Sequence, residues 1–228
     1  MRTFVLALLL LAAALPARAQ DDPTLIGIGV RSRPDYDGAN TRTVDLVPVV
    51  RWYGKPLFAR TTQGVLEGGA RMEVAPGFNA GVQIGYEQGP RDQSRDGSYG
   101  FHLELDGRIG PSPITLLARW REYMKDNHGR QVDLRFTAGV LQSGPALGFV
   151  FAQVTFANAE NVRAFFNVDE SGHLYTDLGV LGSYDVAQNW VLVGSLYLRR
   201  LDSDIARQSA FGSRQNNVYA TAGVAYKF

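Results

Sequence analysis

The last eleven residues of the chain, 218–228, alternate between two kinds of side chain. One face is apolar and ends in two aromatic rings; it holds Val218, Ala220, Ala222, Val224, Tyr226 and Phe228. The other face carries Tyr219, Thr221 and Lys227. Successive side chains of a β-strand point to opposite faces, and a strand that crosses a bilayer needs about 9 to 11 residues with aromatic rings near the interface. Residues 218–228 therefore fit a transmembrane strand, although an edge strand of a soluble sheet alternates in the same way.

The same alternation recurs along the whole chain. Residues 24–31, for example, set Ile26, Ile28 and Val30 against Gly27, Gly29 and Arg31. Further alternating segments cover 44–53, 57–63, 66–74, 80–87, 99–106, 114–123, 131–138, 146–156, 176–184 and 190–200. The segment 57–63 is short, 146–156 is apolar on both faces, and long helical patterns are absent. The pattern predicts an all-β protein of about twelve strands, within a range of about ten to fourteen.

The first 19 residues have the pattern of a secretory signal peptide. Arg2 precedes an apolar run, and Ala17-Arg18-Ala19 supplies the small residues of a cleavage site, so the mature chain is expected to begin at Gln20. The run is too short to cross a bilayer as a helix, and no apolar run of roughly 18 residues follows it. The sequence has no cysteine, which excludes a thiol-linked lipid anchor, disulfides and thiolate chemistry.

The charge balance of the expected mature chain, 20–228, argues against a nucleic-acid partner. Two of the 23 basic residues lie in 1–19, which leaves 21 against 22 acidic residues and a formal charge of −1. A nucleic-acid binder would show a basic excess. In lipid, only helices and closed barrels satisfy every backbone polar group. If this chain crosses a membrane, it does so as a single antiparallel up-and-down barrel domain.

The connections between the segments alternate in length, and this favours the membrane barrel over a soluble sandwich. Short, turn-like connections lie at 54–56, 75–77, 107–113, 142–145 and 185–189, and longer polar ones at 33–42, 88–98, 124–130, 157–173 and 202–217. With the N-terminus in the periplasm, every short turn falls on the periplasmic side, as in outer-membrane barrels. The connection near Gly64 is the exception, because it is very short on the outer side.

The polar face of the segments, expected to line the lumen, carries charges of both signs. The candidate network consists of Glu67, Arg71, Glu87, His102, Glu104, Arg119, Arg121, Asp133 and Arg135, and Asp177 lies on the same face. A wide selective pore tends to carry rings of one sign, whereas opposite charges on neighbouring strands can pair. We expect a narrow or plugged lumen with many ion pairs. Glycines such as Gly81 leave a small water path open as an alternative.

The sequence predicts no catalytic, cofactor or metal site. Of the three histidines, His102 is expected to be a hydrogen-bonded member of the lumen network, His128 lies in a turn-like segment, and His173 lies in a long loop beside Ser171. The D-x-D pairs that begin at Asp35 and Asp202 lack the rest of a calcium-loop pattern. Phosphate-loop, nucleophile-elbow and zinc-protease motifs are absent.

Several motifs resemble those of the MipA/OmpV family of outer-membrane proteins. They are Gly27-Ile28-Gly29, the loop Pro34-Asp35-Tyr36-Asp37-Gly38, Phe165-Phe166-Asn167-Val168, Tyr197-Leu198-Arg199-Arg200-Leu201 and Tyr226-Lys227-Phe228. Departures at Gly89-Pro90-Arg91 and Ser209-Ala210 fall in outer loops. The resemblance implies a barrel in the outer membrane of a Gram-negative cell, no catalytic residues, and scaffolding of murein enzymes such as a lytic transglycosylase and a synthase, or adhesion.

The end of the chain, with Val224, Tyr226 and Phe228, resembles the C-terminal signal of bacterial outer-membrane barrels, which the barrel-assembly machinery reads. A barrel of this kind is surrounded by outer-membrane lipid and lipopolysaccharide. The loop from Pro34 to Gly38 has turn chemistry and is a candidate cap or interaction loop over the barrel mouth. Three functions remain open. The leading one is a non-enzymatic platform of the cell envelope, the alternative is a narrow channel for small solutes, and the third is a barrel hydrolase that acts on lipid.

Overall fold

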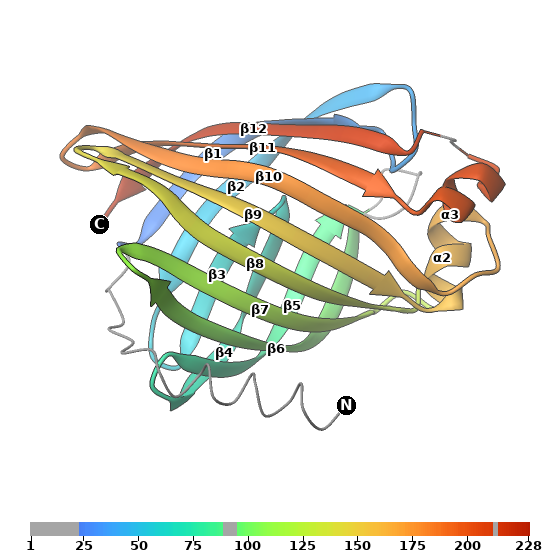
Figure 1. Ribbon diagram of the computed structural model, residues 1–228, viewed down its shortest axis with the longest axis horizontal. Helices are drawn as coiled ribbons and strands as arrows, with labels where there is room; N and C mark the ends of the chain where they lie inside the picture. The colour runs from blue at the N-terminus through green and yellow to red at the C-terminus, as the bar shows by residue number, and fades with distance from the viewer. Residues whose placement is uncertain (1–22, 89–94, 212–213) are drawn as a thin grey trace.

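The described residues form one closed antiparallel barrel (Figure 1). The computed structural model describes residues 23–88, 95–211 and 214–228. The predicted signal peptide lies outside the described residues, as do 89–94 of one predicted outer loop. Twelve strands follow one another around the ring, and β12 pairs with β1 to close it. The predicted strand number and fold class are confirmed.

The strands have the following bounds: β1 (Leu25–Pro34), β2 (Arg42–Tyr53), β3 (Leu57–Thr62), β4 (Val65–Ala75), β5 (Phe78–Gln88), β6 (Arg95–Ile109), β7 (Ser112–Tyr123), β8 (Arg130–Ser143), β9 (Ala146–Ala157), β10 (Gly172–Ala187), β11 (Trp190–Leu201) and β12 (Asn216–Lys227). Two short helices, α2 (Ala159–Phe166) and α3 (Ser203–Gln208), lie in the two longest connections. Among the described helices, none is long and apolar enough to cross a bilayer.

Alternation along each strand separates an apolar outer face from an inner face that is polar over much of its area. In β12 the side chain of Val218 is 44% exposed, whereas that of Tyr219 is 6% exposed and points into the barrel. In β9, whose two faces are both apolar, Phe151 and Thr155 face inward and Val150 faces outward. Because the outer apolar side chains have no protein to cover them, they need lipid around the barrel.

The two ends of the barrel differ. The short turns and the C-terminus lie at one end, and α2 and α3 lie at the other (Figure 1). Asn158 caps α2 by accepting a hydrogen bond from the amide of Asn161, and Asn167 ends the helix in the left-handed conformation. The helices pack in a buried apolar cluster that includes Val162, Leu174 and Ile205. The sequence pattern missed both helices, since six to eight residues give too few turns for a periodic signal.

The wall is irregular at β3. The ladder between β2 and β3 has three residue pairs, Arg51 with Arg60, Trp52 with Ala59 and Tyr53 with Phe58, whereas β1 and β2 are paired over ten. Beyond these three pairs, β3 pairs with β4 alone and turns back at Gln63 and Gly64. The predicted exception near Gly64 is therefore a tight hairpin on the outer side.

Candidate functional site in the lumen and mouth of the barrel

A continuous chain of ion pairs crosses the lumen beside β3 to β8. Four arginines and four carboxylates alternate along it, in the order Arg71, Glu104, Arg60, Glu67, Arg119, Asp133, Arg121 and Glu87. Glu67 and Asp133 are fully buried, and Arg119 Nη2 lies 2.7 Å from Asp133 Oδ2. The chain is neutral, so charges buried in the lumen compensate one another.

Two members of the predicted lumen set behave differently. His102 was expected to hydrogen-bond, but it is buried and neither ring nitrogen has a partner among the described residues. Its ring instead meets the ring of Phe58 edge-on, with 5.2 Å between centroids. The expectation fails because the neighbouring Glu104 is already occupied by Arg60 and Arg71. The guanidinium of Arg135 lies over the ring of Phe151, 4.1 Å from its centroid.

The predicted loop Pro34–Gly38 folds into the mouth of the barrel. Asp37 accepts a 2.8 Å hydrogen bond from Nη1 of Arg199 and another from the hydroxyl of Tyr219. Tyr36 donates a 2.5 Å hydrogen bond to the carbonyl of Phe211, in the connection between β11 and β12. The guanidinium of Arg33 donates to the carbonyl of Asp35 at 2.7 Å. Four contacts thus fasten this loop to the barrel.

A second set of charges lies on the opposite side of the lumen from the first. Nε and Nη2 of Arg199 each donate a 2.9 Å hydrogen bond to the carboxylate of Asp177, which is fully buried. The guanidinium stacks over Tyr175, with 3.6 Å between Cζ and the ring centroid. Arg31 and Arg33 share the carboxylate of Asp45, at 3.2 and 2.5 Å. Together with Asp37, this set holds three arginines and three aspartates and is also neutral.

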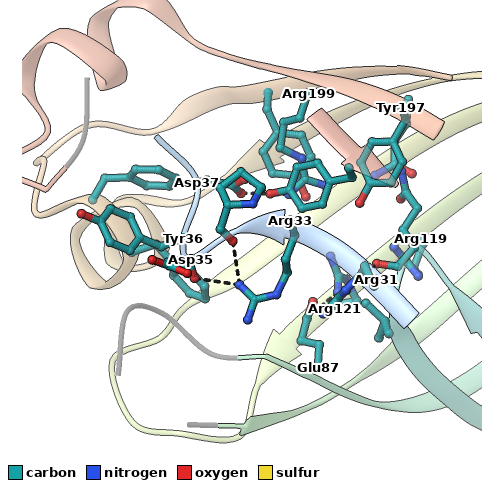
Figure 2. Close-up of a pocket in the computed structure, with 18 residues that line it drawn as sticks. Arg31, Arg33, Asp35, Tyr36, Asp37, Glu87, Arg119, Arg121, Tyr197 and Arg199 are labelled. Atoms are coloured by element: carbon teal, nitrogen blue, oxygen red, sulfur yellow. Dashed lines mark hydrogen bonds and ion pairs between the residues drawn. The ribbon is translucent and has the colours of Figure 1, made fainter. Parts of the chain in front are cut away.

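A cavity of about 120 Å³ lies between the two sets, below the loop (Figure 2). Its polar lining consists mainly of Arg31, Arg33, Arg119, Arg121 and Arg199 with Tyr36, Tyr175, Tyr197 and Tyr219. Figure 2 shows Arg33 directed back to the loop and Arg121 directed to Glu87. The Nε atoms of Arg31 and Arg121 are buried and have no hydrogen-bond partner among the described residues. These two donors suit water or the oxygen atoms of a small polar solute.

The other two histidines lie near the outer end. His128 contacts the carboxylate of Asp96, with 2.5 Å between Nδ1 and Oδ2. His173, at the start of β10, contacts Asp202 Oδ2 through Nδ1 at 3.2 Å and Thr176 Oγ1 through Nε2 at 3.0 Å. Partial desolvation raises the pKa of Asp202, but hydrogen bonds from the backbone of α3 and from His173 outweigh it and hold the pKa below the ordinary value.

Among the described residues, no group of three or more His, Asp or Glu side chains is arranged to hold a metal ion. The D-x-D aspartates have other partners, since Asp37 binds Arg199 and Asp202 caps α3. Val224, Tyr226 and Phe228 face outward at the short-turn end, where the ring of Tyr226 packs against those of Phe228 and Trp190.

Sequence reasoning missed Arg31, Arg60, Gln63 and Arg199 as candidate site residues. The three arginines have the parity of inward positions, and Arg60 pairs directly with Glu67 in the ladder between β3 and β4. The short segment 57–63 gave no secure register, which hid Arg60. The role of Gln63 depends on the path of a hairpin, which alternation does not predict.

The closed twelve-stranded barrel with an apolar exterior and a charged interior defines an outer-membrane type of β-barrel protein. The family model described as "MltA-interacting protein MipA" matches residues 26–228. The chain belongs to the MipA family.

Two solved structures share the fold. The NanC porin has a TM-score of 0.53 and 9% sequence identity, and the match covers 91% of this chain and 100% of that one. A "bacterial polysaccharide outer membrane secretin" has a TM-score of 0.53 and 10% identity, with 90% of this chain and 98% of that one covered. No curated protein sequence matches the chain at a significant level.

Proposed function

We propose that this protein is a non-enzymatic anchor in the outer membrane that holds a murein lytic transglycosylase, with an associated synthase, at its periplasmic end. The proposal rests on the MipA family, whose name states an interaction with MltA. It also rests on one structural observation, the filled lumen. A conducting pore needs a continuous water path, whereas Glu67, Asp133 and Asp177 are here fully buried among arginines.

The short-turn end suits a docking partner. Lys55, Pro76, Pro111 and Gln188 are exposed at four of its turns. Tight turns joined to a closed barrel lose little conformational entropy when a partner binds, so a surface of this kind can be small and still specific. The long loops at the other end face the exterior in this orientation, where lipopolysaccharide surrounds the barrel.

Site-specific photo-crosslinking in intact envelopes tests the anchor. A photoreactive residue in place of Gln188, at the short-turn end, should capture the transglycosylase. The same residue in place of Arg207, which is exposed on α3, is the matched control and should not. Capture from Arg207 alone, or no murein enzyme among the adducts from the turns at Lys55, Pro111 and Gln188, would contradict the proposal.

A second candidate function, hydrolysis of lipid esters, is favoured by one observation. The contacts of Thr176, His173 and Asp202 have the connectivity of a nucleophile, a base and a group that orients the base. An N-cap that fastens α3 to β10 explains the same contacts. The hydrolase predicts that the protein releases fatty acid from phospholipid vesicles. This release should be lost in His173→Ala and kept in Glu160→Gln. No release by the unchanged protein would remove this candidate.

A further inference from the structure

The end of β3 separates from β2 at the tip of the β3–β4 hairpin, whereas β4 stays in the wall through its pairing with β5 from Leu66 to Ala75. If the ladder between β2 and β3 continued in register, Val49 would pair with Thr62, but pairing stops at Arg51. The tip is held inside instead. Nη1 of Arg31 donates a 3.1 Å hydrogen bond to the carbonyl of Gln63, and the side-chain amide of Gln63 donates a 3.0 Å hydrogen bond to Asp177.

These contacts link the hairpin tip to the opposite side of the barrel. In the ring of twelve strands, β10 lies six places from β4 and five from β3. The side chains of Gln63 and Asp177 therefore bridge the lumen. Gln63 and Val65 also line the cavity at the mouth, so the tip forms part of the wall of that cavity. The hairpin closes the barrel together with the ion-pair chain.

The turn itself is fitted to this position. Gln63 and Gly64 both have positive φ, 51° and 85°, as the two central residues of a tight hairpin turn require. Glutamine is uncommon in that conformation, and its bond to Asp177 gives it a role there. A Cβ at residue 64 would lie 1.6 Å from Nη1 of Arg31, so a larger residue there would displace this guanidinium.

Because the β2–β3 ladder stops at Arg51, the part of β2 before Arg51 has an edge without a neighbouring strand. The carbonyl of Ile28 in β1 points toward β12, since it lies 2.9 Å from the position that a Cβ of Gly223 would take. Ile28 is paired with Pro48 of β2. In an antiparallel ladder, a residue that bonds the strand on one side does not bond the strand on the other, so the backbone of Pro48 also points away from β1. Proline has no backbone N–H, and at position 48 this removes no hydrogen bond to β1. The backbone groups of Leu46 and Val50 share this direction. An unpaired edge at membrane depth is costly, and pairing of Thr61 and Thr62 with Val50 and Val49 would cover part of it.

We propose that the tip of the β3–β4 hairpin, residues 61–64, is a movable plug, and that its return to β2 opens a path for small hydrophilic ions and solutes through the cavity at the mouth. In the closed state the tip is bonded to Arg31 and Asp177. In the open state β3 extends its ladder along β2. This gated passage goes beyond the anchor role and does not depend on it.

The absence of native cysteine allows a direct test by disulfide trapping. In planar bilayers, Val49→Cys with Thr62→Cys should form a disulfide under oxidation, because the two positions become neighbours when the ladder extends. The oxidised protein should then conduct steadily, and a reductant should restore the closed state. Trp52→Cys with Ala59→Cys, a pair already adjacent in the ladder, is the matched control and should cross-link without opening the barrel.

A pair of glycine substitutions tests the same plug without oxidation. Gly64→Ala should displace the tip from Arg31 and raise the open probability roughly tenfold or more, since a hydrogen bond from a charged group is lost. Gly110→Ala adds a methyl group at another turn glycine with positive φ but with nothing within 4 Å, and should leave the open probability unchanged. Equal effects of the two substitutions would overturn the proposal. In the disulfide experiment, two results would also overturn the proposal. One is that the Val49/Thr62 cysteine pair stays reduced when the control pair oxidises. The other is that it oxidises but the protein does not conduct.

Discussion

Glu67 shows how single residues hold the lumen closed. Its carboxylate is fully buried and meets the guanidinium groups of Arg60 and Arg119. Two buried arginines sharing one carboxylate leave little net stability, because desolvation of the charges offsets their attraction. Removal of one partner is different, since it leaves charge in a site that water does not reach. The ion pairs as a set therefore add little net stability, whereas the loss of Glu67 alone is costly.

Glu67→Gln should lower the free energy of unfolding by about 3–5 kcal/mol, because two arginines then lose a buried counter-charge. Urea titration of the barrel in lipid vesicles measures this free energy. The folded and unfolded fractions are read from their different electrophoretic mobilities. Asp126→Asn, in an exposed turn, is the control and should change little. A loss below about 1 kcal/mol for Glu67→Gln would show that water reaches this site.

The elements differ in how far the sequence predicts them. For strands with one apolar face, such as β1 and β12, the inward and outward faces were predicted correctly, because alternation alone assigns them. Their pairing registers were not predicted. The faces of β9 could not be assigned, since both are apolar and only its position between β8 and β10 turns Phe151 inward. The path of the β3–β4 hairpin depends on partners distant in sequence, Arg31 and Asp177, and no local pattern encodes it.

The two outer helices should be separable in stability from the barrel. Ile205 is 2% exposed in the cluster that joins α3 to α2 and β10, so Ile205→Ala should cost about 2–5 kcal/mol locally. We expect faster proteolysis within 202–217 on intact cells, with the melting temperature of the barrel unchanged. Arg207→Ala, on the exposed side of α3, should not alter proteolysis. Equal cleavage of both variants would mean that the helices are not held by this cluster.

At the scale of the whole molecule, the same alternation that closes the sheet also sorts apolar side chains to lipid and charges to the lumen. The barrel class, the strand number and the separation of short turns from long loops follow from that rule and were predicted. The pairing of particular charges was not, because it depends on how twelve strands are staggered around the ring. The resulting interior consists of neutral sets of ion pairs with a hairpin tip between them.

Current through the unmodified protein in planar bilayers tests the central claim, a barrel closed from within, most directly. We predict long closed periods with only rare, brief openings, because the hairpin tip and the ion-pair chain fill the lumen. Long-lived open steps of porin size from the unmodified chain, with its hairpin intact, would contradict this account.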